Sequence, residues 1–567
     1  MYYFSIHTIF RRSIVCLIII NFVIATFPAL KAFNHHRASF NLYFPISHGT
    51  ASTTATGFID YGVYDWMNFK ELFEELLPMA EYHTCVDGEW KTFWFGKENF
   101  TNALKRTTII VIDDGWSYEI WKAIYDAFGE TAAKQIEYVV LYYDVGDMQF
   151  TYKIIGWHQY TNDEFINLKI RGGIEDQIRE KSPSVLAYSD RGHCATIGWL
   201  IKSMLPEVRL IVIRIDGFYR VYEEDLYKLV TADEEILKIW NQTVIKSFNE
   251  LMPHGFLGDH LFSIRKINNI IFSLSFGFNI SYLEYKIKKL CKEYNVPQKA
   301  DIIIEMMHDQ LRALKDFIIS WTMLNYEINC PNVFFCISAG NNNTEITKDL
   351  FPQNMSLSDP AIITVGAIYD YDTEEGYKQG QKCSFSNYGD SLKACAPGYK
   401  ILVKIHEYGK TITSDAEVDG TSYSAPLVAC SLACHLATRL AYYEYFKIIG
   451  KVGNYNSFFR RFNINSYMHN FIYRAFENDE DKTDLTPKPS KYDYLDEPIW
   501  DRWNGYGCPD AFDLVLLFQE TLREYFWDNY TIDVPLLLYS TSPSETGGGT
   551  GSAGGTSPNE RPVFTIL

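Results

Sequence analysis

The sequence predicts an α/β protein, a three-layer sandwich in which a mostly parallel central sheet is flanked by helices. The first observation is a series of short runs between residues 107 and 368 that are apolar at nearly every position. Strands have this pattern when helices cover both faces of a parallel sheet. The second is that helix-length stretches separate these runs, as crossover connections require. The third is composition, since 47% of the residues are hydrophobic and 22% charged, which is typical of a chain with a large core.

The predicted strands share continuous hydrophobicity and are Thr107–Asp113, Gln135–Val145, Val208–Ile215, Asn268–Phe276, Val333–Ala339 and Ala361–Ile368. The predicted helices are several turns long and are His193–Met204, Tyr282–Tyr294, Ala300–Asn329 and Ser422–Phe446. Open α/β sheets bind ligands beyond the carboxyl ends of their strands. Residues at those ends are therefore the first candidates for chemistry.

The N-terminus has the pattern of a targeting segment. Arg11 and Arg12 precede an apolar run over residues 13–30. We predict a cleaved signal peptide over residues 1–32, with an uncleaved signal-anchor as the alternative, because the run is barely long enough to span a bilayer. No later stretch is predicted to cross a membrane. The protein is therefore expected to be secreted or to enter the secretory pathway.

Sequons and cysteines agree with secretion. Six Asn-x-Ser/Thr sequons predict a glycoprotein, at Asn99, Asn241, Asn279, Asn342, Asn354 and Asn529. Of the eleven cysteines, Cys16 lies in the predicted signal, and the remaining even number permits disulfides without fixing their pairing. Four cysteines in apolar patterns are predicted to be buried thiols, namely Cys194, Cys336, Cys430 and Cys434.

Charge and composition limit which partners are expected and where the domain boundaries lie. The net charge of −18 disfavours nucleic acid as a partner. We expect a monomer, without membrane contact unless the N-terminal segment is retained. Residues 33–100 lack strong strand signals and are predicted to be an N-terminal extension or a pro-segment. The folded domain is expected over residues 101–535, and the Gly/Ser/Thr-rich residues 536–567 are predicted to be a flexible tail.

Four residues are candidates for an acyl-transfer site, which needs an activated hydroxyl, a base, an orienting acid and oxyanion donors. Ser422 precedes an apolar helix pattern, so its backbone N–H and the helix dipole favour a negative charge there, although Ser also caps helices. Asp113 ends a buried strand, a position that suits an acid that orients an imidazole. The alternative is an aspartate in a turn that ends the strand. His193 opens an amphipathic helix, whereas His48 leads into a Ser/Thr-rich stretch. Asn341 follows a strand, and its side-chain amide could donate to an oxyanion. The alternative is an asparagine in a turn.

Together, in the order Asp, His, Asn, Ser, these residues resemble the subtilisin-like serine protease family, the subtilases (peptidase S8). The serine segment resembles the family's GTSxxAP signature at Gly420, Thr421, Ser422, Ala425 and Pro426, and the acid segment resembles its apolar-Asp-[DST]-Gly signature at Ile112, Asp113, Asp114 and Gly115. Further stretches that look like family elements are residues 360–368, 384–389, 396–398 and 505–511. The resemblance covers roughly residues 101–520 and implies a subtilisin-like fold.

The resemblance also implies the function. It makes Asp113, His193 and Ser422 a catalytic triad and Asn341 the oxyanion donor of a serine endopeptidase that acts on proteins or peptides. It implies that a strand lines the substrate cleft through Ser273, Leu274, Ser275, Phe276 and Gly277. The chemistry needs no cofactor. Family members often bind structural calcium, and the sequence has no contiguous calcium loop of the EF-hand kind.

The chain departs from the family pattern in several places. Cys194 and Ala195 stand where the family usually has Gly-Thr, and Tyr423 and Ser424 stand where Met-Ala is more usual. Long separations predict surface insertions around residues 146–187, 218–265 and 477–501. These departures keep open an alternative, a catalytically impaired subtilase fold that binds or regulates. An esterase of the α/β-hydrolase kind is a weaker alternative, because Ser422 lacks the second glycine of a G-x-S-x-G elbow.

Overall fold

The computed structural model describes most of residues 67–538. The segments outside the described residues within this range are 68, 87–88, 145, 157–191, 219–225, 263–268, 327–331, 407–412, 451–501 and 531–533, with short gaps within 372–378 and 504–510. The predicted signal segment, nearly all of the predicted tail and the predicted insertion at 477–501 also lie outside the described residues.

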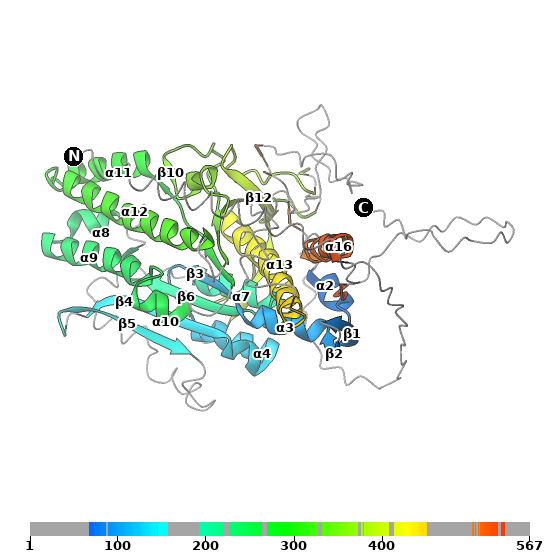
Figure 1. Cartoon of the computed structure of the whole chain (residues 1–567). Helices are drawn as coiled ribbons and strands as arrows, with labels where there is room; N and C mark the ends of the chain where they lie inside the picture. Colours follow the sequence, from blue (N-terminus) through cyan, green and yellow to red (C-terminus); the bar gives the residue numbers. More distant parts are fainter. Residues whose placement is uncertain are drawn as a thin grey trace, which may run out of the picture. The chain divides into compact units, whose positions relative to one another are not determined.

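An eight-stranded sheet forms the centre of the fold (Figure 1). Its strands are β3 (Thr107–Ile112), β4 (Ile136–Asp144), β5 (Gln149–Gly156), β6 (Arg209–Ile215), β7 (Asn269–Leu274), β9 (Asn332–Ser338), β11 (Ile362–Ile368) and β12 (Leu392–Pro397). Across the sheet they run in the order β12-β11-β9-β7-β3-β6-β4-β5, and every neighbouring pair is parallel except β4 and β5. The predicted mostly parallel sheet is confirmed.

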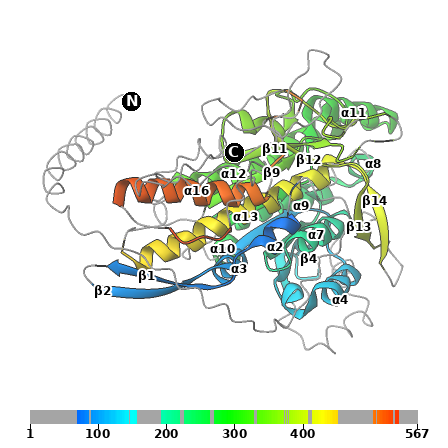
Figure 2. The same cartoon turned by 90° about the vertical axis from the view of Figure 1, so that its right-hand side faces the viewer.

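Helices cover both faces of this sheet. Ile109 and Val111 of β3 belong to one hydrophobic cluster, and Ile110 and Ile112 belong to another. The first cluster includes residues of α3 (Lys97–Lys105), α4 (Tyr118–Lys134), α7 (His193–Met204), α13 (Thr421–Ile448) and α16 (Ala511–Tyr530). The second includes residues of α8 (Leu226–Thr231), α9 (Glu234–Leu251), α10 (Phe256–Phe262), α11 (Ile280–Glu293) and α12 (Lys299–Met323). The three-layer sandwich is therefore confirmed (Figures 1 and 2).

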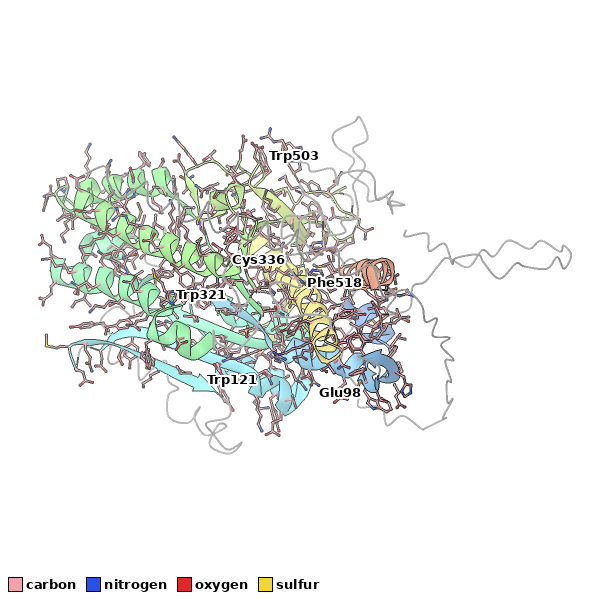
Figure 3. The ribbon with its side chains drawn as sticks, viewed as in Figure 1. Glu98, Trp121, Trp321, Cys336, Trp503 and Phe518 are labelled. Atoms are coloured by element: carbon pink, nitrogen blue, oxygen red, sulfur yellow. The ribbon has the colours of Figure 1, made fainter. Side chains whose placement is uncertain are left out.

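Large aromatic side chains fill both layers (Figure 3). Trp321 of α12 packs against Phe272 of β7, with 5.4 Å between the ring centroids. Trp121 of α4 lies in the other cluster and donates its indole N–H to the carbonyl of Ala133 at 3.0 Å. Both layers therefore bury large aromatic surfaces, and the indole N–H of Trp121 also has a hydrogen-bond acceptor.

Helix α13 passes through the core of the fold. It is long and apolar enough to cross a membrane, contrary to the expectation that no such stretch follows the N-terminus, but its whole apolar window is buried inside the protein. Its small side chains explain this result, because Ala429, Ala433 and Ala437 raise the hydropathy and also let neighbouring strands approach closely. It is a core helix, and its N-terminus carries Ser422.

Several elements escaped prediction. Strands β1 (Ala80–Val86) and β2 (Glu89–Phe95) form an antiparallel hairpin, which Asp87-Gly88 between them signals in the sequence. The predicted insertion at 218–265 holds α8, α9 and α10, which pack on the sheet because their apolar faces are buried. The hairpin of β13 (Ile401–Ile405) and β14 (Ser414–Val418) and the edge strand β5 were also missed. Charged residues interrupt the apolar patterns of these strands.

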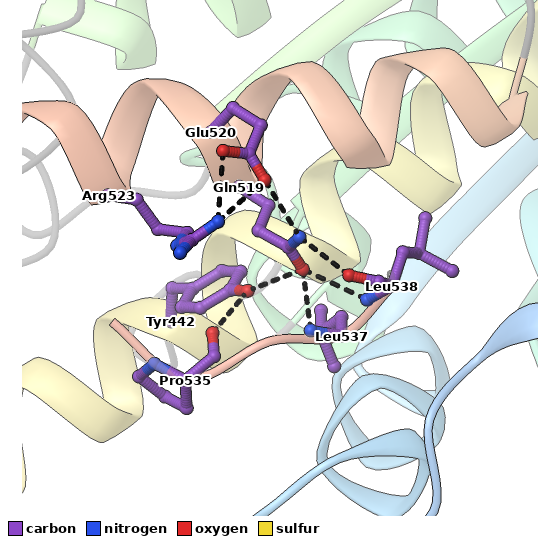
Figure 4. Close-up of polar contacts among 7 residues, drawn as sticks. All are labelled: Tyr442, Gln519, Glu520, Arg523, Pro535, Leu537 and Leu538. Atoms are coloured by element: carbon purple, nitrogen blue, oxygen red, sulfur yellow. Dashed lines mark hydrogen bonds and ion pairs between the residues drawn. The ribbon is translucent and has the colours of Figure 1, made fainter. Parts of the chain in front are cut away.

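The last described residues are held in place by one buried amide (Figure 4). The side-chain oxygen of Gln519 on α16 accepts hydrogen bonds from the backbone N–H groups of Leu537 and Leu538 and from the Tyr442 hydroxyl of α13. Its NH₂ group donates to the Leu538 carbonyl at 2.8 Å. The Leu537 carbonyl in turn accepts from the N–H of Leu77. Segments from the two ends of the described chain therefore meet in one network.

Candidate active site

Asp113 lies at the carboxyl end of β3, in the middle of the sheet. All six residues of β3 are buried, and the Asp113 side chain is 5% exposed. One carboxylate oxygen, Oδ1, accepts a hydrogen bond from the N–H of Asp114 at 2.7 Å. The other, Oδ2, lies 2.9 Å from Nδ1 of His193. The carboxylate is thus oriented by its own backbone before it contacts the imidazole.

His193 is the first residue of α7. Gly192 precedes it with φ 58° and ψ 51°, a left-handed conformation that glycine adopts without strain. The N–H of Cys194 donates to Oδ1 of Asp114 at 3.0 Å, which ties the helix N-terminus to the strand that carries Asp113. Two adjacent aspartates therefore hold this histidine, one by its ring and one by the backbone that follows.

The local charges change the acidity of His193. Burial lowers the pKa of this imidazole. The charge of Asp113, its hydrogen bond to Nδ1 and the charge of Asp114 raise the pKa, and together they outweigh burial, so that the pKa is about 9 instead of 6.5. The side chain is 29% exposed, so it is still accessible from solvent. The neighbouring carboxylates therefore favour the protonated form of the ring in the protein without substrate.

Ser422 lies in the first turn of α13 and faces the end of β7. Its hydroxyl donates to the carbonyl of Ser275 at 3.4 Å, while the hydroxyl of Ser275 donates to the carbonyl of Ser422 at 2.9 Å. The next residue, Tyr423, makes an edge contact with the His193 ring at 5.8 Å between centroids. Among the described residues Ser422 has no direct hydrogen bond to His193. In proteins without substrate, such bonds are often long and tighten only in the reacting complex.

Asn341 follows β9 and contacts the residue before Ser422. Its side-chain oxygen accepts from the N–H and from the hydroxyl of Thr421, both at 2.9 Å. The Thr421 hydroxyl also accepts from the N–H of Gly340 at 3.0 Å. A Cβ at Gly420, whose φ is 147°, would lie only 3.2 Å from the Asn341 NH₂ group, so glycine allows this approach. Asn341 is exposed, its side-chain oxygen is held by Thr421, and its NH₂ group faces Gly420, two residues before Ser422.

The five predicted cleft residues divide into two groups. Ser273 and Leu274 lie inside β7, where they are fully buried and pair with β9, so their backbone is used within the sheet. Ser275, Phe276 and Gly277 follow the end of β7, and the Ser275 carbonyl contacts Ser422. Only these last three lie beyond the part of β7 that pairs with β9.

Cys194 does not occupy the cleft. Its side chain is fully buried in the hydrophobic cluster beneath α7. Burial raises the pKa of the thiol far above its ordinary value, and the charges of Asp113 and Asp114 add to this, so the group stays protonated. The other three cysteines predicted to be buried thiols are also buried and unpaired, Cys336 on β9 being labelled in Figure 3.

Two residues of the site were not among the predicted site residues. Asp114 ties α7 to β3, and Thr421 orients the Asn341 amide. Each is a small polar residue beside a predicted site residue. Ser275, which was predicted to line the cleft, also holds the start of α13 through its hydroxyl. Within the described residues no group of three or more His, Cys, Asp or Glu side chains is arranged to hold a metal ion.

The family model described as "Subtilase family" (Peptidase_S8) matches residues 241–444. Over this segment the chain matches the subtilase family. The matched subtilase segment covers just over a third of the 567 residues and includes Ser275, Asn341 and Ser422. Asp113 and His193 lie outside it, yet they meet at the same edge of the sheet. The family supports a serine peptidase as the kind of hydrolase.

Solved structures similar to this chain include two proteases. One is "a cold adapted subtilisin-like serine proteinase", with 15% identity over 59% of this chain and 77% of that chain, and a TM-score of 0.28. The other is "a Lanthipeptide Protease", with 12% identity over 73% of this chain and 88% of that chain, and a TM-score of 0.31. None of the curated proteins compared with the chain matches it.

Proposed function

We propose that the protein is a secreted serine endopeptidase in which Ser422 is the nucleophile, His193 the general base and Asp113 the residue that orients it. The observation that carries this proposal is the 2.9 Å contact between His193 Nδ1 and Asp113 Oδ2. This contact uses Nδ1 and leaves Nε2 of His193 free to accept the proton of a serine hydroxyl. Secretion is supported by the signal-like N-terminal segment and the sequons.

The proposed reaction is acyl transfer without a cofactor. His193 removes the proton of the Ser422 hydroxyl as the oxygen attacks the peptide carbonyl, and Asp113 stabilises the imidazolium. The Asn341 NH₂ group and the Ser422 N–H donate to the oxyanion of the tetrahedral intermediate. His193 then protonates the leaving amine, and water hydrolyses the acyl-enzyme. The Ser422 hydroxyl must leave its contact with the Ser275 carbonyl at the start of this sequence.

Ser422→Ala tests the nucleophile. We expect the variant to lose labelling by a fluorophosphonate probe and to lose peptide hydrolysis, with an unchanged far-ultraviolet circular dichroism spectrum. Ser320→Ala is the matched control, because the Ser320 hydroxyl bonds to the Asp316 carbonyl within α12, away from the site. Equal labelling of Ser422→Ala and the parent would exclude Ser422 as the nucleophile.

One observation favours the alternative, a subtilase fold that binds without cleaving. The hydroxyl of Ser422 donates to Ser275 and not to His193 among the described residues. A protein of this kind would fail to react with the probe in its parental form while still binding peptides. The same labelling experiment on the parent protein therefore separates the two functions.

The pKa of His193 sets the expected pH dependence. Because the base must be neutral and its pKa is about 9, kcat/KM for a peptide substrate is expected to rise by about tenfold per pH unit below pH 9 and to level off above it. The stability of the fold is expected to change with pH in the opposite direction to kcat/KM. The folded pKa lies above 6.5, so the Asp113–His193 pair stabilises the fold fully below pH 6.5, and this contribution is lost as pH rises through about 9.

Asp114→Asn is the matched variant for this profile. Asparagine keeps an oxygen for the N–H of Cys194 and removes one of the charges that raise the His193 pKa. The rising limb should therefore move to lower pH. A parental profile that is already flat above pH 7 would contradict the expected pKa.

A further inference from the structure

Gln353 is a buried glutamine close to the candidate site that the reaction above does not use. It follows β10 (Leu350–Phe351) and begins the 3-10 helix η6 (Gln353–Leu357). Strand β10 pairs with β8 (Phe278–Asn279), which continues the chain just after the predicted cleft residues. This pairing brings the Gln353 side chain, which is 1% exposed, to the ends of β7 and β9.

The side chain joins these two strand ends. Its NH₂ group donates to the carbonyl of Phe276 at 3.0 Å and to the carbonyl of Ser338 at 2.7 Å. The last paired residues of the two strands are Leu274 and Ile337, so both carbonyls lie beyond the ladder. One amide thus bridges β7 and β9 after their backbones have stopped pairing with each other.

Each of these strand ends holds a different part of the candidate site. Beyond β7, Ser275 exchanges hydrogen bonds with Ser422. Beyond β9, Asn341 accepts from the N–H and hydroxyl of Thr421. The distance between the nucleophile and the amide of Asn341 therefore depends on how far apart the two strand ends lie, and Gln353 bridges them.

The surroundings of Gln353 are shaped to its side chain. A Cβ on Gly277 would lie 2.1 Å from the Gln353 amide nitrogen, so the absence of a side chain there makes the room that the amide occupies. The hydroxyl of Thr364 on β11 donates to the Gln353 carbonyl at 2.9 Å and fixes the backbone. The amide oxygen, Oε1, is buried without a hydrogen-bond partner among the described residues. A buried polar atom left unsatisfied is costly, so an apolar side chain would fill this space at lower cost if filling it were the only role.

We propose that Gln353 is a positioning residue, which sets the separation between the cleft strand and Asn341 by holding the carbonyls of Phe276 and Ser338 with one NH₂ group. The inference rests on the proposed peptidase function. Acyl transfer needs the hydroxyl and the oxyanion donor at fixed positions around one carbonyl carbon, and a displacement of about 1 Å costs up to about 10²-fold in rate. Removal of both hydrogen bonds is expected to release the strand ends and to slow the chemical step.

Gln353→Met tests this role with a matched control. Methionine keeps the length and volume of glutamine but donates no hydrogen bond. Gln310→Met is the control, because Gln310 on α12 is also 1% exposed, also has a buried Oε1 without a partner among the described residues, and donates to Asn241 instead of to the strand ends. Both variants should remain folded, and Gln353→Met should lose more thermal stability, because it leaves two buried carbonyls without a donor whereas Gln310→Met removes one side-chain hydrogen bond.

Two readouts distinguish positioning from stability. Gln353→Met is expected to lower kcat by about 10- to 100-fold with little change in KM, whereas Gln310→Met leaves both unchanged. Hydrogen exchange measured by mass spectrometry should show about tenfold faster exchange in Gln353→Met, confined to peptides spanning residues 274–280 and 337–343. Parental kcat in a folded Gln353→Met, or an equal fall of kcat in Gln310→Met, would overturn the proposal.

Failure of the proposed function would look different. The peptidase proposal would be overturned if the parent protein showed no peptide hydrolysis, or only hydrolysis that Ser422→Ala retains. The exchange measurement does not require activity and would then decide alone whether Gln353 holds the strand ends. Unchanged exchange in both peptides would show that it does not.

Discussion

Asp113→Asn is expected to lower kcat/KM by about 10⁴-fold and to leave the fold intact. The reason lies in the two contacts of the carboxylate. Oδ1 accepts from the N–H of Asp114, so the oxygen of an asparagine would occupy that position and its NH₂ group would point at His193. Nδ1 would then have to accept a hydrogen bond, and the proton would lie on Nε2. That tautomer cannot take a proton from Ser422.

The control for this variant is Asp114→Asn, the same change one residue further on. It keeps the acceptor for the Cys194 N–H and leaves His193 bonded to a carboxylate, so its kcat/KM at high pH should stay within about tenfold of the parent. Both variants are measured for kcat/KM above pH 9 and for thermal stability. An Asp113→Asn protein that stays within about tenfold of the parent would mean that His193 is not held by Asp113 during turnover.

The sequence predicted the central sheet because its strands are buried on both faces. Thr107–Ile112, for instance, is apolar or β-branched at every position, and all six residues are buried between helices. The same criterion overlooked the β1–β2 hairpin, in which Glu89 and Lys91 interrupt an otherwise apolar and aromatic strand. It also treated residues 218–265 as a surface insertion, although helix α9 in that segment buries Trp240 and Phe248 against the sheet.

The candidate site was predicted from chain order and local context, and the contacts between its parts were not. That His193 Nδ1 reaches Asp113 depends on the crossover through β4 and β5, which no local pattern describes. The burial of Cys194 was predicted from its apolar context and is confirmed. Cys194, Ile197 and Ile201 have the spacing of one helix face, and all three are buried. Gln353 had no sequence signal at all, because its role arises from strand ends that are distant in the chain.

Deletion of residues 1–100 is expected to abolish folding, whereas deletion of residues 1–66 is expected to leave a folded protein. The reason is that residues from Met67 onward belong to the core. Phe69 of α2 (Phe69–Glu75), Phe95 of β2 and Phe100 of α3 are each at most 1% exposed. The Phe95 ring packs 4.9 Å from the Tyr442 ring of α13, the helix that begins beside Ser422.

The size of this effect follows from the burial of those rings. Truncation of one buried Phe costs about 3–5 kcal/mol, and a domain has only about 5–15 kcal/mol of stability in total. The deletion also removes the N–H of Leu77, which bonds to the Leu537 carbonyl, and it cuts α3 in its first turn, since the boundary predicted at residue 100 falls inside that helix. We therefore propose that residues 67–100 stay in the mature protein. Soluble yield and thermal unfolding of the two deletions, each behind the same signal peptide, check this. If the 101–567 protein is soluble and unfolds cooperatively at a temperature near that of the 67–567 protein, residues 67–100 are a removable pro-segment and the proposal is wrong.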